Sequence, residues 1–178
     1  MSKPRTANPA LAISEADLAS ALALIGTEID HQPLRSSALA RIMRETFHGS
    51  DAGGAWDWRM AYDLMQAAAI QVVLRGDGAA GDVAAAKLLA SRLLTETRRS
   101  EQQIRLQQFS TPLPFAALAV RAAAIRKGET VLEPSAGTGA LAGFAARAGA
   151  TLSLNEIDPF RHSLLRAVFG GEATGHDG

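Results

Sequence analysis

The sequence predicts an α/β fold, in which a helical amino-terminal region precedes the start of a doubly wound parallel sheet. Up to about residue 105, apolar residues recur at helical spacing between helix-start and helix-stop residues. From residue 106 onward, short β-rich segments alternate with a helical segment, which is typical of parallel sheets. A glycine turn at 135–139 joins the first strand to its helix. These observations predict two domains, 1–105 and 106–178.

Composition and charge limit the classes of function. The chain has 178 residues, of which 47% are hydrophobic but only 5% aromatic, so we expect helix-rich packing through alanine. The 18 basic and 18 acidic side chains balance each other, unlike the basic excess of a dedicated nucleic-acid binder. No apolar run is long enough to span a bilayer, and no signal-peptide core is found, so we expect a cytoplasmic protein without a membrane partner.

Cysteine and histidine usage removes several chemistries. The chain contains no cysteine, which excludes disulfides, thiolate metal sites and the thiolate-dependent methylation of cytosine at carbon 5. The four histidines are dispersed and lack partners at metal-ligand spacing, so no metal site is predicted.

The amino-terminal region carries start and stop signals for four helices. Ser14, followed three residues later by Asp17, resembles a capping box, and Gly26 is a candidate stop for the helix that it opens. The helical spacing of the nearby aromatic residues favours core packing over a base-stacking platform. Those aromatic residues are Trp56, Trp58 and Tyr62. The expected helices cover residues 15–25, 36–47, 58–75 and 83–97.

The carboxyl-terminal region alternates between strands and helices after one further helix. Each predicted strand is short and apolar, and each predicted helix ends at or near a glycine. A last segment, 172–176, is a candidate third strand. The other expected elements are a helix at 115–126, a strand at 130–133, a helix at 140–148, a strand at 151–155 and a helix from 158 or 159 to 169.

The first strand and the glycine turn predict a ligand site. Glu133 ends the strand, Gly137 and Gly139 form the turn, and Glu156 ends the next strand, where it is placed to accept hydrogen bonds from a ribose diol. Ligands of open α/β sheets bind at this carboxyl edge, and the amides at a helix start favour an anionic group. Three interpretations stay open at this point: an S-adenosylmethionine site, a nicotinamide dinucleotide site and a glycine turn without a ligand.

Two features favour S-adenosylmethionine. Glu133 directly precedes the glycine turn, where its carboxylate would repel a pyrophosphate and attract the ammonium and sulfonium groups of S-adenosylmethionine. One helix upstream, Phe109-Ser110-Thr111-Pro112 has the form F-x-T-P, although a threonine followed by proline also begins ordinary helices.

Together, these motifs resemble those of a known family. Residues 107–177 resemble the cofactor half of adenine-N6 DNA methyltransferases, which have a Rossmann-like fold. With 97–101 and 54–58 included, the chain is similar to the methylase region of bacterial strawberry-notch-like methylase/helicase proteins. The resemblance implies S-adenosylmethionine as cofactor, DNA as a partner of the complete protein, and a helicase-type region in cis.

The resemblance also implies roles for individual residues. Phe109, Thr111 and Pro112 would form a lid over the methionine end of the cofactor, and Glu133, Gly137 and Gly139 would cradle that end. Glu156 would hold the ribose, Ile157 would lie against the adenine ring, and Asp177 would accept from the exocyclic amine of the adenine.

The chain departs from this family in one respect that concerns activity. It contains no Asn/Asp-Pro-Pro-aromatic tetrapeptide, which binds the target amine of a flipped-out base, and no Walker-type motif. We therefore assign no catalytic residue and expect a fragment that binds the cofactor without turnover. A non-catalytic binding or scaffold module and a nicotinamide-binding fragment are the alternatives. The strand at 130–133 would have one unpaired edge, which predicts poor stability or an edge-strand dimer.

Overall fold

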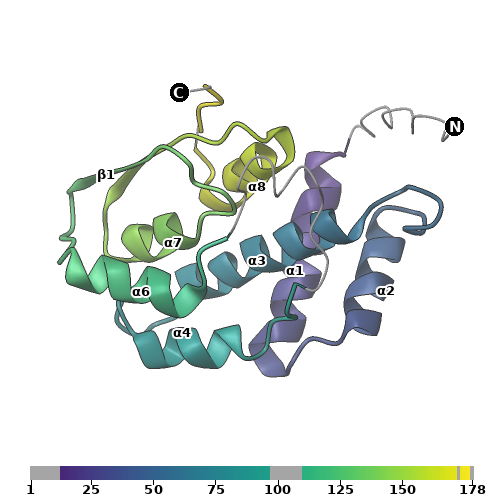
Figure 1. Ribbon diagram of the computed structural model, residues 1–178, viewed down its shortest axis with the longest axis horizontal. Helices are drawn as coiled ribbons and strands as arrows, with labels where there is room; N and C mark the ends of the chain where they lie inside the picture. Colours follow the sequence, from purple (N-terminus) through teal and green to yellow (C-terminus); the bar gives the residue numbers. More distant parts are fainter. Residues whose placement is uncertain (1–12, 97–109, 172, 177–178) are drawn as a thin grey trace, which may run out of the picture.

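The computed structural model describes residues 13–96, 110–171 and 173–176, and these form an α/β arrangement. The described residues contain seven helices and a two-stranded parallel sheet, which confirms the α/β prediction. In Figure 1 the long helix α3 (Trp58–Arg75) runs through the middle of the molecule, with α1 (Glu15–His31) and α2 (Ser36–Thr46) at one end and β1 (Thr130–Glu133) at the other. No helix among the described residues combines the length and the apolar character that a membrane crossing needs.

Side-chain caps begin three of the amino-terminal helices. The Ser14 hydroxyl oxygen accepts from the amide of Asp17 at 3.0 Å, as the capping box predicts. Asp57 caps α3 by accepting from the amide of Met60, and Asp82 caps α4 (Val83–Ala90). Helix α4 begins where the sequence predicts, but it ends at Ala90, earlier than the predicted end at 97.

The prediction that α1 ends at Gly26 is wrong. Helix α1 continues to His31, and Gly26 lies buried within it. A Cβ at Gly26 would lie 3.1 Å from Nη2 of Arg75 at the end of α3, so this glycine permits a close approach between two helices. A local sequence pattern does not distinguish such a packing glycine from a helix stop.

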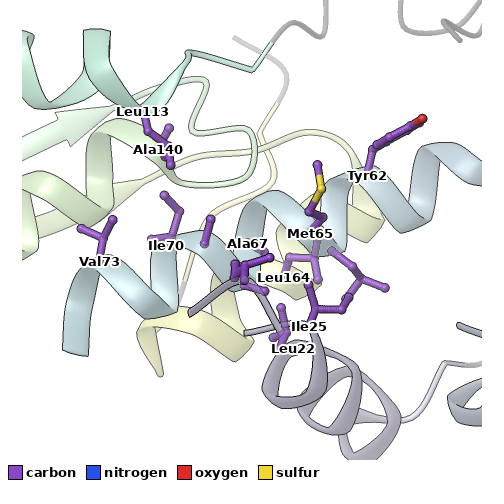
Figure 2. Close-up of a cluster of buried hydrophobic side chains, with 14 of the residues drawn as sticks. Leu22, Ile25, Tyr62, Met65, Ala67, Ile70, Val73, Leu113, Ala140 and Leu164 are labelled. Atoms are coloured by element: carbon purple, nitrogen blue, oxygen red, sulfur yellow. The ribbon is translucent and has the colours of Figure 1, made fainter. Parts of the chain in front are cut away.

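The core forms mainly on α3. Leu64, Met65 and Ile70 of this helix are almost fully buried, and they pack in one cluster with Leu22 of α1 and Leu164 of α8 (Pro159–Phe169). Figure 2 shows this cluster, with side chains from α1 and α3 facing each other. Because the cluster spans both predicted regions, the helical region and the sheet share one hydrophobic core.

The aromatic residues near the start of α3 pack as predicted from their spacing. Trp56 is buried and donates its indole N–H to the carbonyl oxygen of Gly49 at 3.0 Å. Its ring lies 5.6 Å from that of Trp58 in an edge-to-face arrangement, and Tyr62 is also buried. These rings therefore contribute to packing rather than form an exposed stacking platform.

The carboxyl-terminal elements follow the predicted order. They are α6 (Leu113–Ala122), β1 (Thr130–Glu133), α7 (Ala140–Arg147), β2 (Thr151–Leu154) and α8 (Pro159–Phe169). The two strands pair in parallel, with Thr130 opposite Thr151. Thr174 forms a further parallel bridge with Asn155, so the segment predicted as a third strand begins to pair on the far side of β2 from β1.

Helices cover one face of the sheet. Val131 and Leu152 point into the core, whereas Leu132 on the opposite face is 70% exposed. Among the described residues, β1 pairs with β2 alone, so its other edge carries unpaired backbone groups.

Candidate ligand-binding site

The two glycines of the turn serve different purposes. Gly137 and Gly139 have φ angles of +59° and +86°, in the left-handed region that glycine tolerates best. A Cβ at Gly139 would lie 2.7 Å from Cε2 of Phe169, so this glycine also allows α7 to pack against α8. At Gly137 the nearest atom to such a Cβ is 3.9 Å away. The predicted turn is thus present, and Gly137 is required by its backbone conformation rather than by lack of space.

Glu156 joins the glycine turn to the start of α8. Its side chain is 6% exposed, Oε2 accepts from the amide of Gly137 at 2.7 Å, and Oε1 accepts from the amide of Asp158 at 2.8 Å. Each carboxylate oxygen can accept a second hydrogen bond, so the bonds to the backbone do not use all the acceptor positions of this side chain. The adjacent Ile157 is 48% exposed and offers an apolar surface beside this carboxylate.

Glu133 lies at the start of α7. Its carboxylate accepts a hydrogen bond from the backbone of Ala142, the third residue of that helix, while Oε2 is buried without a partner among the described residues. Burial raises the pKa of Glu133 to about 7, and the negative charge of Glu156 adds to the rise although the bond from Ala142 opposes it. A protein carboxylate therefore already occupies the helix end where a pyrophosphate would bind.

Two arginines and two further carboxylates lie behind these glutamates. Arg161 donates to Asp63 from Nε at 3.1 Å and from Nη2 at 2.8 Å, and both side chains are at most 3% exposed. Arg59 pairs with Asp158, which also caps α8. The electrostatic influence of Arg161 extends to Glu156 and Asp158.

The carboxylates around the turn therefore outnumber the guanidinium groups. The carboxylates belong to Asp63, Glu133, Glu156 and Asp158, and the guanidinium groups to Arg59 and Arg161. Among the described residues, no three acidic or histidine side chains are arranged to hold a metal ion. The excess of negative charge suits an organic cation.

One stripe of α3 supports the whole turn, and the sequence analysis missed it. Arg59, Asp63, Gln66 and Ile70 follow one another at helical spacing. Arg59 contacts Asp158, the cap of α8, and Asp63 contacts Arg161 within that helix. Gln66 accepts from the buried Thr138 hydroxyl at 3.1 Å, and Ile70 packs on α7. The available signal was three polar residues on one face of a helix that is otherwise largely apolar.

Residues before α6 lie on the other side of the turn. Thr111 and Pro112 are exposed, and together with Ser110 and Thr138 they line a cavity of about 310 Å³. The lining does not include Glu133 or the other carboxylates of the site. The structure thus brings the Thr-Pro motif to the glycine turn, while Phe109 and Asp177 lie outside the described residues.

Asn155 fixes the carboxyl-terminal segment at the same edge of the sheet. Its Nδ2 donates to the carbonyl oxygens of Pro134 and His176 at 3.0 and 2.9 Å, and its Oδ1 accepts from the Thr174 hydroxyl and the His176 amide. This side chain therefore connects the glycine turn with the segment that starts a third strand. The sequence analysis assigned it no role.

Comparisons with known proteins add no identification. The chain matches no protein-family model, no curated protein and no solved structure.

Proposed function

We propose that this chain binds S-adenosylmethionine at the carboxyl edge of its sheet, as the cofactor half of a Rossmann-like, adenine-N6-type DNA methyltransferase. The observation that carries the proposal is the position of Glu133. Its carboxylate accepts from the start of α7, has one buried oxygen without a partner among the described residues, and lies close enough to Glu156 to be influenced by its charge. A site with this charge favours a ligand that brings positive groups.

The magnitude of the electrostatic effect supports one class of candidate ligand over the other. Two unit charges about 4 Å apart interact by about 4 kcal/mol at an effective dielectric constant of about 20. A pyrophosphate at the start of α7 would meet Glu133 with repulsion of this order, whereas a sulfonium or ammonium would gain it. Each of these two effects alone corresponds to about a thousandfold in affinity. This comparison disfavours a nicotinamide dinucleotide.

The remaining residues suit the other parts of the cofactor. Glu156 has acceptor positions left for a ribose diol, and the exposed Ile157 beside it suits the adenine ring. Thr111 and Pro112 line the cavity next to the turn and suit the methionine end. We further propose that Phe109 belongs to the same lid as Thr111 and Pro112, and that Asp177 accepts from the exocyclic amine of the adenine.

We propose that this chain alone binds S-adenosylmethionine and does not transfer its methyl group. The sequence contains no Asn/Asp-Pro-Pro-aromatic motif to orient a target amine. Methylation of DNA, and any association with a helicase-type region, would belong to a complete protein of the strawberry-notch-like kind.

One observation favours a second candidate, a non-catalytic scaffold. The bonds from Gly137 and Asp158 to Glu156 hold the turn closed without a ligand. In that case the glycine turn would serve only to connect the strand with its helix.

Calorimetric titration of the full chain at pH 8 tests the proposal. S-adenosylmethionine and S-adenosylhomocysteine should bind, and Ile157→Ala should weaken both severalfold because it removes apolar surface beside the ribose site. Leu118→Ala on α6 is the matched control, since Leu118 is 49% exposed and Ile157 48%. Binding of NADH in place of these ligands would establish the dinucleotide interpretation. A folded chain that binds none of the three ligands would support the scaffold.

A further inference from the structure

We propose that Gln66, a residue of the helical region, binds the carboxylate of the cofactor's methionine part and so makes α3 part of the ligand site. This inference rests on the proposed function and adds a specificity residue to it. Gln66 lines the cavity of about 310 Å³ that α3, the end of α4, residues 110–113 and the glycine turn enclose.

The orientation of the Gln66 amide is fixed by a buried partner. Oε1 accepts from the hydroxyl of Thr138 at 3.1 Å, and Thr138 is only 2% exposed. This bond leaves Nε2 with its two N–H groups, and no described residue supplies an acceptor for them. Because Oε1 is fixed by Thr138, the Nε2 group of the same amide is also fixed in orientation, and it is well suited to donate to an acceptor on a ligand.

A second polar group in the same cavity also lacks a partner. The hydroxyl oxygen of Ser110 is buried without a hydrogen bond among the described residues. Buried hydroxyl groups normally have a partner, so this hydroxyl is available to a polar atom of a ligand in the cavity. Thr111, next in the chain, adds a hydroxyl to the lining.

The described lining of the cavity is uncharged and suits the carboxylate end. Its described residues are apolar side chains, the hydroxyl groups and Gln66, with no acidic residue among them. The carboxylates of the site, Glu133 among them, lie outside this lining. The two sides of the turn thus match the two charged groups of an amino acid. The carboxylates on one side are available to its ammonium group, and the neutral donors of the cavity are available to its carboxylate.

Packing keeps Gln66 at this place. Figure 2 shows Leu113 and Ala140 on the side of α3 where Ile70 points, and all three side chains are buried. Gln66 precedes Ile70 by four residues and therefore shares its face of the helix. The part of the wall that Gln66 forms is consequently built on a rigid element rather than on a loop.

Titration of truncated and complete ligands tests this inference on the full chain. Gln66→Met keeps the length of the side chain and removes its donors. It should weaken S-adenosylhomocysteine about tenfold, the effect of one hydrogen bond to a charged group, and leave 5′-deoxy-5′-methylthioadenosine, which lacks the amino-acid part, unchanged. Gln71→Met is the matched control, because Gln71 lies on the same helix outside the cavity lining.

The outcomes separate this inference from the proposed function and from a structural role. If Gln66→Met weakens both ligands equally or weakens neither, Gln66 does not recognise the amino-acid part. If the unaltered chain binds neither ligand, the proposed function itself is wrong. As a readout that does not depend on a variant, the side-chain amide signals of Gln66 should shift with S-adenosylhomocysteine and not with the truncated nucleoside. Unchanged signals in the presence of bound S-adenosylhomocysteine would overturn the inference.

Discussion

Charging Glu133 should destabilise the ligand-free protein, and Glu133→Gln should remove this effect. Burial raises the pKa of this carboxyl from 4.5 to about 7. Below pH 4.5 both the folded and the unfolded chain hold the proton, so the group costs nothing. As the pH rises from 4.5, the unfolded chain loses its proton first, and the folded state loses stability until the pH exceeds about 7.

The full rise in pKa corresponds to about 3 kcal/mol, and most of it falls between pH 5 and pH 8. Glutamine resembles the protonated acid in size and cannot ionise. The free energy of unfolding of Glu133→Gln, relative to the unaltered chain, should therefore increase by about 2 kcal/mol between these two pH values. Urea denaturation of both proteins at pH 5 and pH 8 measures this difference.

Glu15→Gln, which removes an exposed carboxylate from α1, serves as the control. If the difference between Glu133→Gln and the unaltered chain does not change with pH, the carboxylate of Glu133 is not buried as described. A cationic ligand should reverse the preference, because it requires the charged carboxylate. About a tenth of Glu133 is charged at pH 6, so the Kd for S-adenosylmethionine should fall about tenfold between pH 6 and pH 8, and Glu133→Gln should abolish this dependence.

Three further substitutions test the packing. Gly143→Ala should destabilise the fold by about 1–3 kcal/mol, because its Cβ would lie 2.4 Å from Cγ2 of Ile70. When Ile70→Ala is combined with it, thermal unfolding should show a loss of stability smaller than the sum of the two single losses. Asp63→Ala should cost about 3 kcal/mol in urea denaturation because it leaves Arg161 buried without its main partner, and addition of Arg161→Met should recover part of that loss. Leu132→Lys, at a side chain that is 70% exposed beside the unpaired edge of β1, should abolish any dimer of the unaltered chain that light scattering detects.

The elements with strong local signals were predictable from the sequence. The strands at Thr130 and Thr151, the glycine turn and the caps at Ser14 and Asp57 all follow from patterns within a few residues. Each pattern is a direct consequence of backbone geometry or of hydrogen bonding at the N-terminus of a helix. Tertiary packing changes such elements little.

Contacts between distant segments were not predictable in the same way. Thr138 and Gln66 are 72 positions apart, and Arg161 and Asp63 are 98 positions apart, so no spacing rule connects them. Gly26 was misjudged for the same reason, since its close neighbour is Arg75 at the far end of another helix. The sequence analysis located Glu133 beside the turn, but its bond to Ala142 and its unpartnered oxygen required the structure.

The polar contacts that hold the glycine turn connect the helical region with the region of the sheet. Gln66 and Asp63 belong to the helical region, while Thr138 and Arg161, which they hold, belong to the region after residue 106. Without α3, the guanidinium of Arg161 would lose its bidentate partner, and the hydroxyl of Thr138 would lose the only acceptor that it has among the described residues. Polar groups that are buried in pairs are costly to separate, because each then lacks a partner. The predicted boundary near residue 105 therefore crosses the polar contacts that hold the glycine turn, and the helices before it form part of the candidate site.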